Sequence, residues 1–252
     1  QAYSEGHKFL KRRDYASAKA QYEISVAVDP AFAPGQYQLA YIAKKDGDLA
    51  AAEKYYRDAV ESDPTHFKSW FGLGNLYYEK GNNSKAIEAL KMSISVNASY
   101  TQAYYVLAQV YENQKNNNLA VQNLKQAIEI DKTYTLAYDL LGRIYIEEEK
   151  YGETIALLKG LTGDTASYKT YYYLSQAYNL QQNYSAGLAA ATKALSNPKQ
   201  KNWAPALIEK GTALKGLDRN KEAIETWRIA AKDARWKSVA DHLIDQLMNE
   251  GK

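Results

Sequence analysis

Residues 70–98 read WFGLGNLYYEKGNNSKAIEALKMSISVNA, and this stretch decides the fold. It combines large apolar residues with two small ones at helical intervals, on either side of a polar break that contains Gly81. The marked positions are Trp70, Leu73, Gly74, Tyr77 and Ala86. Apolar residues three and four positions apart share one face of a helix, and Gly and Asn accept the backbone conformations that end a helix. The stretch therefore predicts two amphipathic helices joined by a tight turn.

The same pattern recurs along the chain at a step of 34 residues, read from the spacing of Pro30 and Pro64. A small residue stands at the Gly74 position in each copy: Gly6, Ala40, Gly74, Ala108, Gly142, Ser175 and Gly211. A second small residue stands at the Ala86 position: Ala18, Ala52, Ala86, Ala120, Thr154, Gly187 and Ala223. Helices that cross closely need small side chains at the crossing point. We therefore expect seven helix pairs, each crossing at these two positions.

The spacing W-x2-L-G-x2-Y…A resembles that of the tetratricopeptide repeat family, over essentially the whole chain. The resemblance implies an all-α fold, a right-handed superhelical α-solenoid that forms a single domain over residues 1–252. The expected repeats are 1–32, 33–66, 67–100, 101–134, 135–167, 168–203 and 204–234. Residues 235–249 then place apolar side chains on one helical face without a partner helix, which predicts a capping helix. Docking onto another protein is the alternative for this helix.

Repeat five departs from the pattern, because Gly160 and Gly163 interrupt its second helix. The polar segment 197–202 also lengthens the step between repeats six and seven. These departures predict a change of superhelical pitch, or a hinge, between repeats five and seven. A tolerated surface insertion is the alternative.

Composition excludes several classes of function. The 252 residues are 46% hydrophobic and 24% charged, as in an ordinary folded protein, and the net charge of +3 is spread among mixed charges, so nucleic acid is not an expected partner. The absence of Cys removes disulfides and thiol nucleophiles, and no apolar run is long enough for direct insertion into a membrane. The chain begins at Gln1, which favours a protein exported to the periplasm after removal of a signal, with the cytoplasm as the alternative.

Catalytic chemistry has no recognisable motif here. His7, His66 and His242 lie in different repeats without metal-ligand spacing. The consecutive residues Glu147 to Glu149 radiate from a helix and do not face one another as an acid and base pair would. The glycines recur with the repeat and form no phosphate-binding loop. We therefore expect no enzyme activity, no cofactor and no metal.

In the tetratricopeptide family the first helix of each repeat lines a concave face, and the residue after the Trp position points into it. The resemblance places Tyr3, Tyr37, Phe71, Tyr105, Asp139, Tyr172 and Ile208 there. Exposed aromatic rings suit binding because they offer large rigid surfaces. With the residues five, eight and nine after the Trp position, this gives the candidate partner-binding residues Tyr3, Tyr37, Tyr41, Phe71, Asn75, Tyr78, Tyr105, Gln109, Arg143 and Tyr172. The alternative is that several of these tyrosines pack between adjacent first helices.

The expected function is that of a protein-interaction scaffold or adaptor that binds an extended peptide or a helix of a partner. Family members that grip chaperone tails carry Lys and Asn at set positions, and only Lys68 matches here, so that role is disfavoured. Two alternatives are a self-assembling structural module, with homo-oligomers, and a regulatory arm of a larger protein. The repeat signature does not identify the partner.

Overall fold

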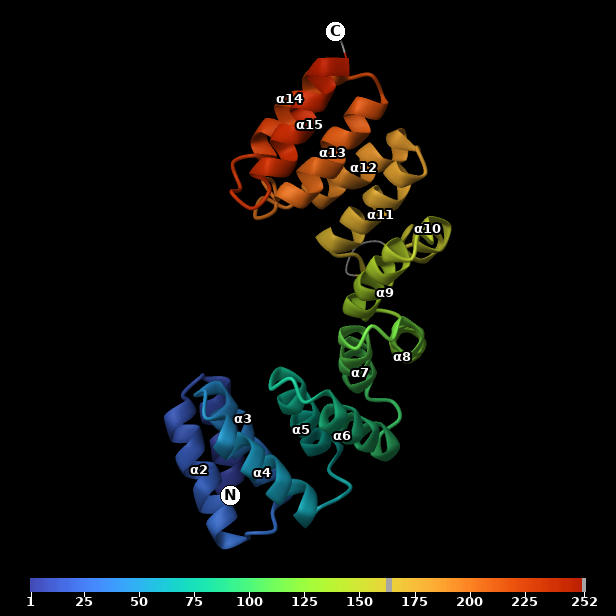
Figure 1. The fold of residues 1–252 in the computed structure, drawn as a ribbon. Coiled ribbons are helices and arrows are strands. Elements are labelled where there is room, and N and C mark those ends of the chain that lie inside the picture. The colour runs from blue at the N-terminus through green and yellow to red at the C-terminus, as the bar shows by residue number, and fades with distance from the viewer. Residues whose placement is uncertain (162–164, 251–252) are drawn as a thin grey trace. The chain divides into compact units, whose positions relative to one another are not determined.

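The computed structural model describes residues 1–161 and 165–250, and all regular elements in these ranges are helices. Figure 1 shows them in order along the chain. Their bounds are α1 (Ala2–Lys11), α2 (Tyr15–Val28), α3 (Ala33–Lys45), α4 (Leu49–Ser62), α5 (Phe67–Glu79), α6 (Asn83–Val96), α7 (Thr101–Asn113), α8 (Asn117–Ile130), α9 (Thr135–Glu147), α10 (Tyr151–Leu158), α11 (Tyr168–Leu180), α12 (Tyr184–Ala194), α13 (Ala204–Gly216), α14 (Asn220–Ala230) and α15 (Lys237–Glu250). The all-α prediction is confirmed.

The helices divide into two compact units, Gln1–Ile130 and Asp131–Lys252. Unit 1 contains α1 to α8 and unit 2 contains α9 to α15. Within each unit, consecutive helices pack as pairs, and first helices of neighbouring pairs also touch, as α3 does with α5 and α11 does with α13. Each expected repeat holds one pair, and α15 packs on α14.

Short polar turns set where the helices begin. The Asp48 side chain accepts a hydrogen bond from the backbone N–H of Ala51, and Asn82 does the same for Lys85, so each residue caps the second helix of its pair. Gly47 precedes the first of these caps with φ of 82°, a conformation that suits glycine. The helix α10 is short and ends at Leu158, ahead of Gly160, as expected. Gly163 lies outside the described residues.

The two helices of a pair cross where the sequence predicts. In four pairs the small residue of the first helix is a glycine. A Cβ built on it would lie within 3 Å of the side chain four residues after the second small position, so only glycine leaves enough room for that side chain. The pairs are Gly6 with Tyr22, Gly74 with Leu90, Gly142 with Leu158 and Gly211 with Trp227. Repeats two, four and six carry Ala40, Ala108 and Ser175 at this position. In repeat two the ring of Tyr56 lies against Gly72 of the next repeat.

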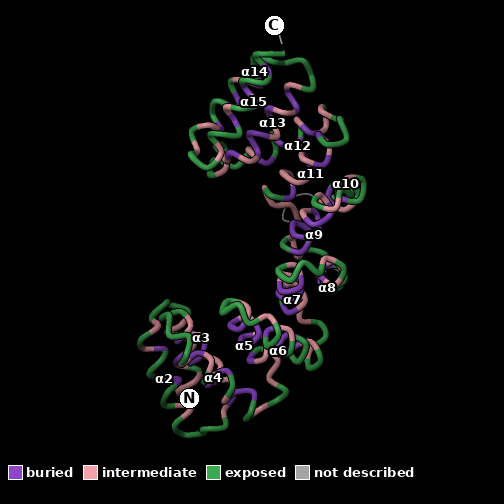
Figure 2. Tube along the Cα trace, viewed as in Figure 1, coloured by how far each residue is buried: buried purple, intermediate pink, exposed green. Residues whose placement is uncertain are grey.

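The core of each unit runs along the inner sides of the helix pairs, where Figure 2 shows buried residues facing one another. In unit 1, Tyr22 and Ile42 belong to one buried cluster. In unit 2, α13, α14 and α15 enclose Trp227, which has 0% exposure. None of the helices in the described ranges has the length and hydrophobicity that a membrane span requires.

Candidate functional site

Unit 1 contains a hollow of about 300 Å³ between the first helices α3 and α5. Its lining residues are Tyr37, Tyr41, Lys44, Lys45, Tyr56, Phe71, Gly72 and Asn75, and we call it the α3–α5 hollow. The residues from α3 recur at intervals of three and four, so one helical face supplies them. The residues from α5 recur at the same intervals, so one face of each of two neighbouring first helices lines the hollow.

Tyr56 from α4 borders the hollow and is only 3% exposed. The ring reaches this place because Gly72 has no side chain; a Cβ there would lie 2.3 Å from the Tyr56 ring. The ring centroid of Tyr37 lies 5.9 Å away. Burial raises the pKa of both tyrosines, so their hydroxyls remain protonated at neutral pH and can donate hydrogen bonds.

Two lysines carry positive charge to the edge of the hollow. Lys44 Nζ lies 2.7 Å from a carboxylate oxygen of Glu79, and Lys45 Nζ lies 5.0 Å from the ring centroid of Tyr15. Asn75 adds an amide that can both donate and accept. The hollow thus combines aromatic walls with a few polar groups, as binding sites for peptides and small ligands do.

Sequence models of tetratricopeptide repeats match residues 3–67, 37–99 and 101–134. The chain belongs to the tetratricopeptide repeat family. Proteins of this family typically serve as protein-interaction scaffolds without catalytic activity, and that general role fits the fold of this chain. No curated protein sequence matches it.

Solved structures of tetratricopeptide repeat proteins have the same fold. A tetratricopeptide repeat protein from Parabacteroides merdae is 18% identical with a TM-score of 0.63, and the match covers 98% of this chain and 97% of the other. PilF of Pseudomonas aeruginosa is 15% identical with a TM-score of 0.68, over 83% and 93% of the two chains. MamA is 22% identical with a TM-score of 0.56, over 68% and 95%. At these identities the likeness concerns the fold.

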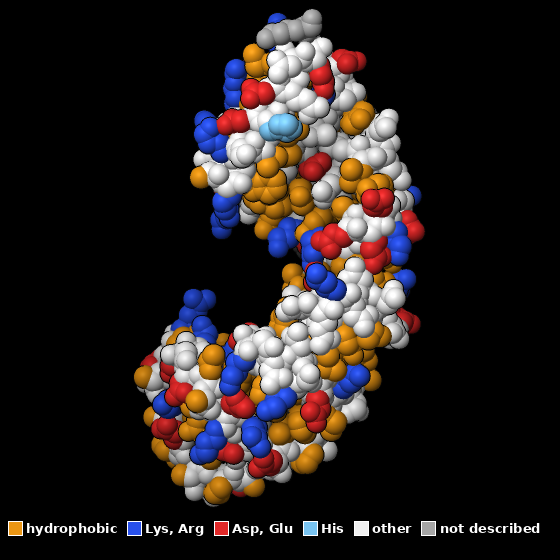
Figure 3. All heavy atoms as spheres, viewed as in Figure 1, with side chains coloured by type: hydrophobic (Ala, Val, Ile, Leu, Met, Phe, Trp, Pro, Cys, Tyr) orange, Lys and Arg blue, Asp and Glu red, His pale blue; other side chains and the backbone are white. Residues whose placement is uncertain are grey.

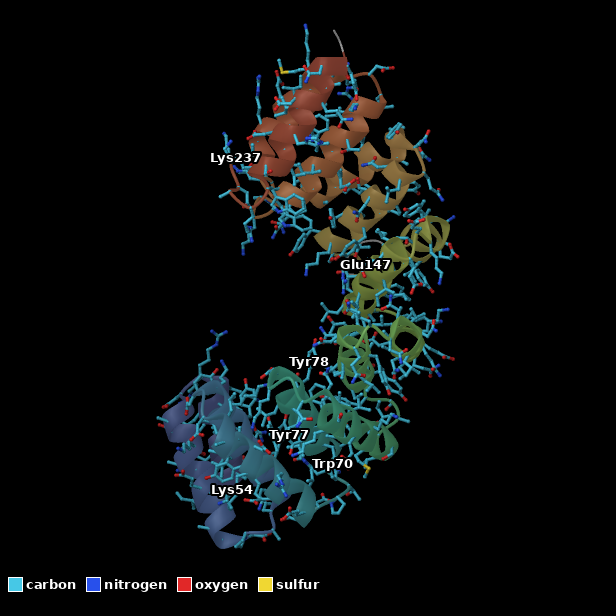
Figure 4. The ribbon with its side chains drawn as sticks, in the orientation of Figure 1. Lys54, Trp70, Tyr77, Tyr78, Glu147 and Lys237 are labelled. Carbon is cyan, nitrogen blue, oxygen red and sulfur yellow. The ribbon has the colours of Figure 1, made fainter. Side chains whose placement is uncertain are left out.

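Within this family member, four of the ten residues predicted from the repeat positions line the α3–α5 hollow. They are Tyr37, Tyr41, Phe71 and Asn75. Tyr78 lies near the end of α5, beyond the hollow (Figure 4). Tyr105 and Gln109 lie on α7, where the Gln109 amide donates to the Tyr105 hydroxyl at 3.4 Å.

Tyr3 packs inside the first repeat. Its ring centroid lies 4.5 Å from that of His7, 5.6 Å from that of Tyr22 and 5.0 Å from that of Phe32. These neighbours come from α1, α2 and the N-cap residue of α3. Phe71 also has an aromatic neighbour, Tyr100, at 5.1 Å, but it keeps a side in the hollow.

In unit 2 the two remaining predicted residues have separate surroundings. Arg143 Nη1 donates to Glu147 at 2.6 Å across one turn of α9, the helix whose end Figure 4 marks at Glu147. Tyr172 on α11 contacts the rings of Tyr173 and Trp203, each with its centroid 5.0 Å away.

The family position rule was wrong for two residues that it placed on the concave face. Asp139 is 6% exposed and Ile208 is 9% exposed. Asp139 accepts hydrogen bonds from the hydroxyls of Ser167 and Thr170, so it holds the start of α11. Burial raises the pKa of its carboxyl.

The residues that sequence reasoning left out of the site are Lys44, Lys45, Tyr56 and Gly72. The two lysines stand eight and nine residues after the Trp position, so the family rule already pointed to them. The sequence predicts that Tyr56 is a packing residue, and its side chain is buried in the structure. The available signal was Gly72 itself, a glycine of α5 two residues before the repeat position Gly74, and the Tyr56 ring lies against it.

Proposed function

We propose that this chain is an interaction scaffold whose α3–α5 hollow receives a side chain from an extended peptide or helical segment of a protein partner. The observation that supports it is the convergence of Tyr37, Tyr41 and Phe71 on one hollow, with Asn75 beside them. Aromatic residues in such places contribute strongly to binding because they bury a large area with little loss of rotamer freedom.

The size of the hollow limits the ligand. At about 300 Å³ it is at the small end of ligand sites, so it fits one large apolar side chain and adjoining main chain. The described residues contain no cluster of acidic, His or Cys side chains that could hold a metal ion. A peptide therefore suits the hollow better than a metal-dependent substrate.

Polar groups at the edge would orient the peptide. The Tyr37 hydroxyl donates at neutral pH, and the Asn75 amide can pair with both groups of a peptide unit. Glu79 already neutralises Lys44, so Lys45 supplies most of the free positive charge. A mildly acidic peptide with one large apolar residue is the expected ligand.

The test is selection of peptides from a random display library on the purified chain, followed by affinity measurement for the selected peptide. The double variant Tyr37→Ala with Phe71→Ala should bind at least about tenfold more weakly, since aromatic contacts at interface centres are each worth roughly 2 kcal/mol. Tyr55→Ala is the matched control, because Tyr55 is a half-buried tyrosine of unit 1 that does not line the hollow. Circular dichroism shows whether each variant is folded.

Two results would contradict the proposal. One is a selected peptide that binds the double variant as tightly as the natural chain. The other is an equal loss of affinity in the Tyr55 control, which would assign the effect to stability. Light scattering at two concentrations addresses the self-assembly alternative, for which the measured mass should grow with concentration.

A further inference from the structure

Unit 2 holds a second group of aromatic residues, between α11 and α13, that the packing of the core does not account for. The ring centroid of Trp203 lies 4.8 Å from that of Tyr168 and 5.0 Å from that of Tyr172, and both pairs meet edge to face. All three side chains remain partly exposed. Figure 3 shows hydrophobic side chains gathered on this side of unit 2.

A carboxylate without a basic partner lies at the same α11–α13 interface as these rings. Glu209 of α13 is partly buried, and its Oε2 accepts a hydrogen bond of 2.9 Å from the Asn179 amide. Among the described residues no lysine, arginine or histidine forms an ion pair with it. Asn179 lies on α11 two turns after Tyr172, and Glu209 lies on α13 two turns after its N-cap residue Trp203, so the carboxylate and the rings share the α11–α13 interface. Burial raises the pKa of Glu209 to about 7.

The hydrogen bonds around Glu209 keep the carboxylate in a fixed position. The same amide nitrogen of Asn179 donates to the main-chain oxygen of Glu209 at 2.9 Å. Gly187 of α12 makes room for this amide, because a Cβ there would lie 2.1 Å from its oxygen. Neither bond needs a negative charge, since a glutamine at position 209 would offer an amide oxygen to Asn179 as well. The fold therefore does not require the charge of Glu209.

We propose that Glu209 and the rings of Tyr168, Tyr172 and Trp203 form a binding site for one arginine side chain of a protein partner. A partly buried carboxylate without a counterion is unfavourable, and a cation from outside removes that cost. Aromatic faces attract cations. A guanidinium group suits both features, because it stacks on rings and donates paired hydrogen bonds to a carboxylate.

Other ligands fit these groups less well. A divalent metal needs several oxygen or nitrogen ligands, and this place has one carboxylate. A neutral apolar side chain would cover the rings but leave Glu209 more deeply buried and still unpaired. A lysine would satisfy the charge, although its ammonium group neither stacks nor forms a two-bond fork.

The site is independent of the α3–α5 hollow, because all of its residues belong to unit 2. The variant Tyr37→Ala with Phe71→Ala should therefore bind arginine as the natural chain does. Failure of the peptide proposal and failure of the arginine proposal can be told apart by this one comparison.

The experiment titrates the full chain with acetyl-Gly-Arg-Gly-amide and follows the indole N–H signal of Trp203 by NMR. The matched probe is the same peptide with citrulline, which keeps the shape of arginine and lacks the charge. We expect at least tenfold weaker binding of the citrulline peptide. Glu209→Gln, which retains the bond to Asn179, should lose at least tenfold in affinity for the arginine peptide. Glu225→Gln, which changes an exposed carboxylate of α14 outside the site, should bind normally.

The pH dependence gives a third readout. Only about a tenth of Glu209 is ionised one unit below its pKa and about nine tenths one unit above, so affinity should rise about tenfold from pH 6 to pH 8. Tyr172 on α11 is the titratable group that the charge of Glu209 reaches, and it stays neutral over this range. In Glu209→Gln the residual affinity should not change with pH.

The proposal is overturned if the citrulline peptide binds as tightly as the arginine peptide. Undiminished affinity in Glu209→Gln would also overturn it, as would a rise with pH that persists in that variant. Equal affinity for a lysine peptide would overturn the assignment of arginine.

Discussion

The substitution Gly72→Ala should close the α3–α5 hollow by displacing the ring of Tyr56. The added Cβ would lie 2.3 Å from Cε1 and 2.5 Å from Cζ of that ring, whereas carbon atoms in contact lie about 3.5–4.0 Å apart. The ring must therefore move by more than about 1 Å. Because Tyr56 borders the hollow, the free space lies on that side.

The size of the effect follows from three contributions. Overpacking a core costs about 1–3 kcal/mol, and replacing a helical glycine by alanine returns about 0.5–1 kcal/mol. Relaxation into the hollow keeps the first contribution to about 2 kcal/mol or less, so we expect a net loss of stability of up to about 1 kcal/mol. The displaced ring then occupies space that the ligand needs, so peptide affinity should fall by at least about tenfold, or 1.4 kcal/mol.

Two further glycines calibrate this result. Gly211→Ala would place a Cβ 2.2 Å from Nε1 of Trp227, which is 0% exposed and donates a hydrogen bond of 3.2 Å to the Ile208 carbonyl. With the ring enclosed and its bond at risk, the loss should be about 2–3 kcal/mol. Gly152→Ala meets its nearest atom at 3.7 Å, so it should be stabilising by about 0.5–1 kcal/mol.

The assay is urea unfolding followed by circular dichroism at 222 nm, together with peptide affinity measured by fluorescence anisotropy on the folded variants. From the highest to the lowest urea concentration at the midpoint, the expected order is Gly152→Ala, natural chain, Gly72→Ala and Gly211→Ala. Equal midpoints for Gly72→Ala and Gly211→Ala, with unchanged peptide affinity in the first, would refute the reasoning. That outcome would mean that Tyr56 has no free space in which to relax.

Two further predictions concern stability. The pKa of Glu209 is about 7 in the folded chain and near 4.5 when unfolded, so the native state holds the proton more tightly between these values; the free energy of unfolding should fall on the order of 3 kcal/mol from pH 4.5 to pH 7. The free energy of unfolding of Glu209→Gln should lack this part of the pH dependence. The same pH dependence of urea unfolding in both proteins would disprove the prediction. Asp48→Ala removes the cap on Ala51 and should cost about 1 kcal/mol in urea unfolding, with the exposed Asp46→Ala near zero; a similar loss in both would rule out the cap as the cause.

The helix pairs could be predicted from the sequence because one repeat carries all the information that its own packing needs. Gly74 and Leu90 are 16 residues apart, and their contact is internal to one pair. The caps are more local still, since Asp48 and Asn82 bond to residues three positions on. A pattern that repeats every 34 residues therefore specifies each pair without reference to the rest of the chain.

The candidate site depends on neighbours that a single repeat does not specify. Tyr3 and Tyr37 occupy the same repeat position and have equivalent ring neighbours, Tyr22 and Phe32 for the first and Tyr56 and His66 for the second. Tyr37 lines the α3–α5 hollow because the next first helix supplies the opposite wall. Asp139 occupies this position too, and the following repeat buries it with two hydroxyl donors. A repeat position predicts which helical face a side chain occupies. Whether that side chain is exposed depends on residues from the next repeat.

The α3–α5 hollow coincides with a departure from the glycine packing that repeats one and three share. In repeats one and three, a glycine receives the large side chain of its own pair, Tyr22 against Gly6 and Leu90 against Gly74. In repeat two the Cβ of Ala40 stands at that crossing, and Tyr56 lies against the next first helix instead. Its ring thereby becomes part of a lining shared by two repeats. Where local packing breaks its own rule, a functional site is the expected reason, and here the tyrosine that departs from the rule also lines the hollow that we propose for binding.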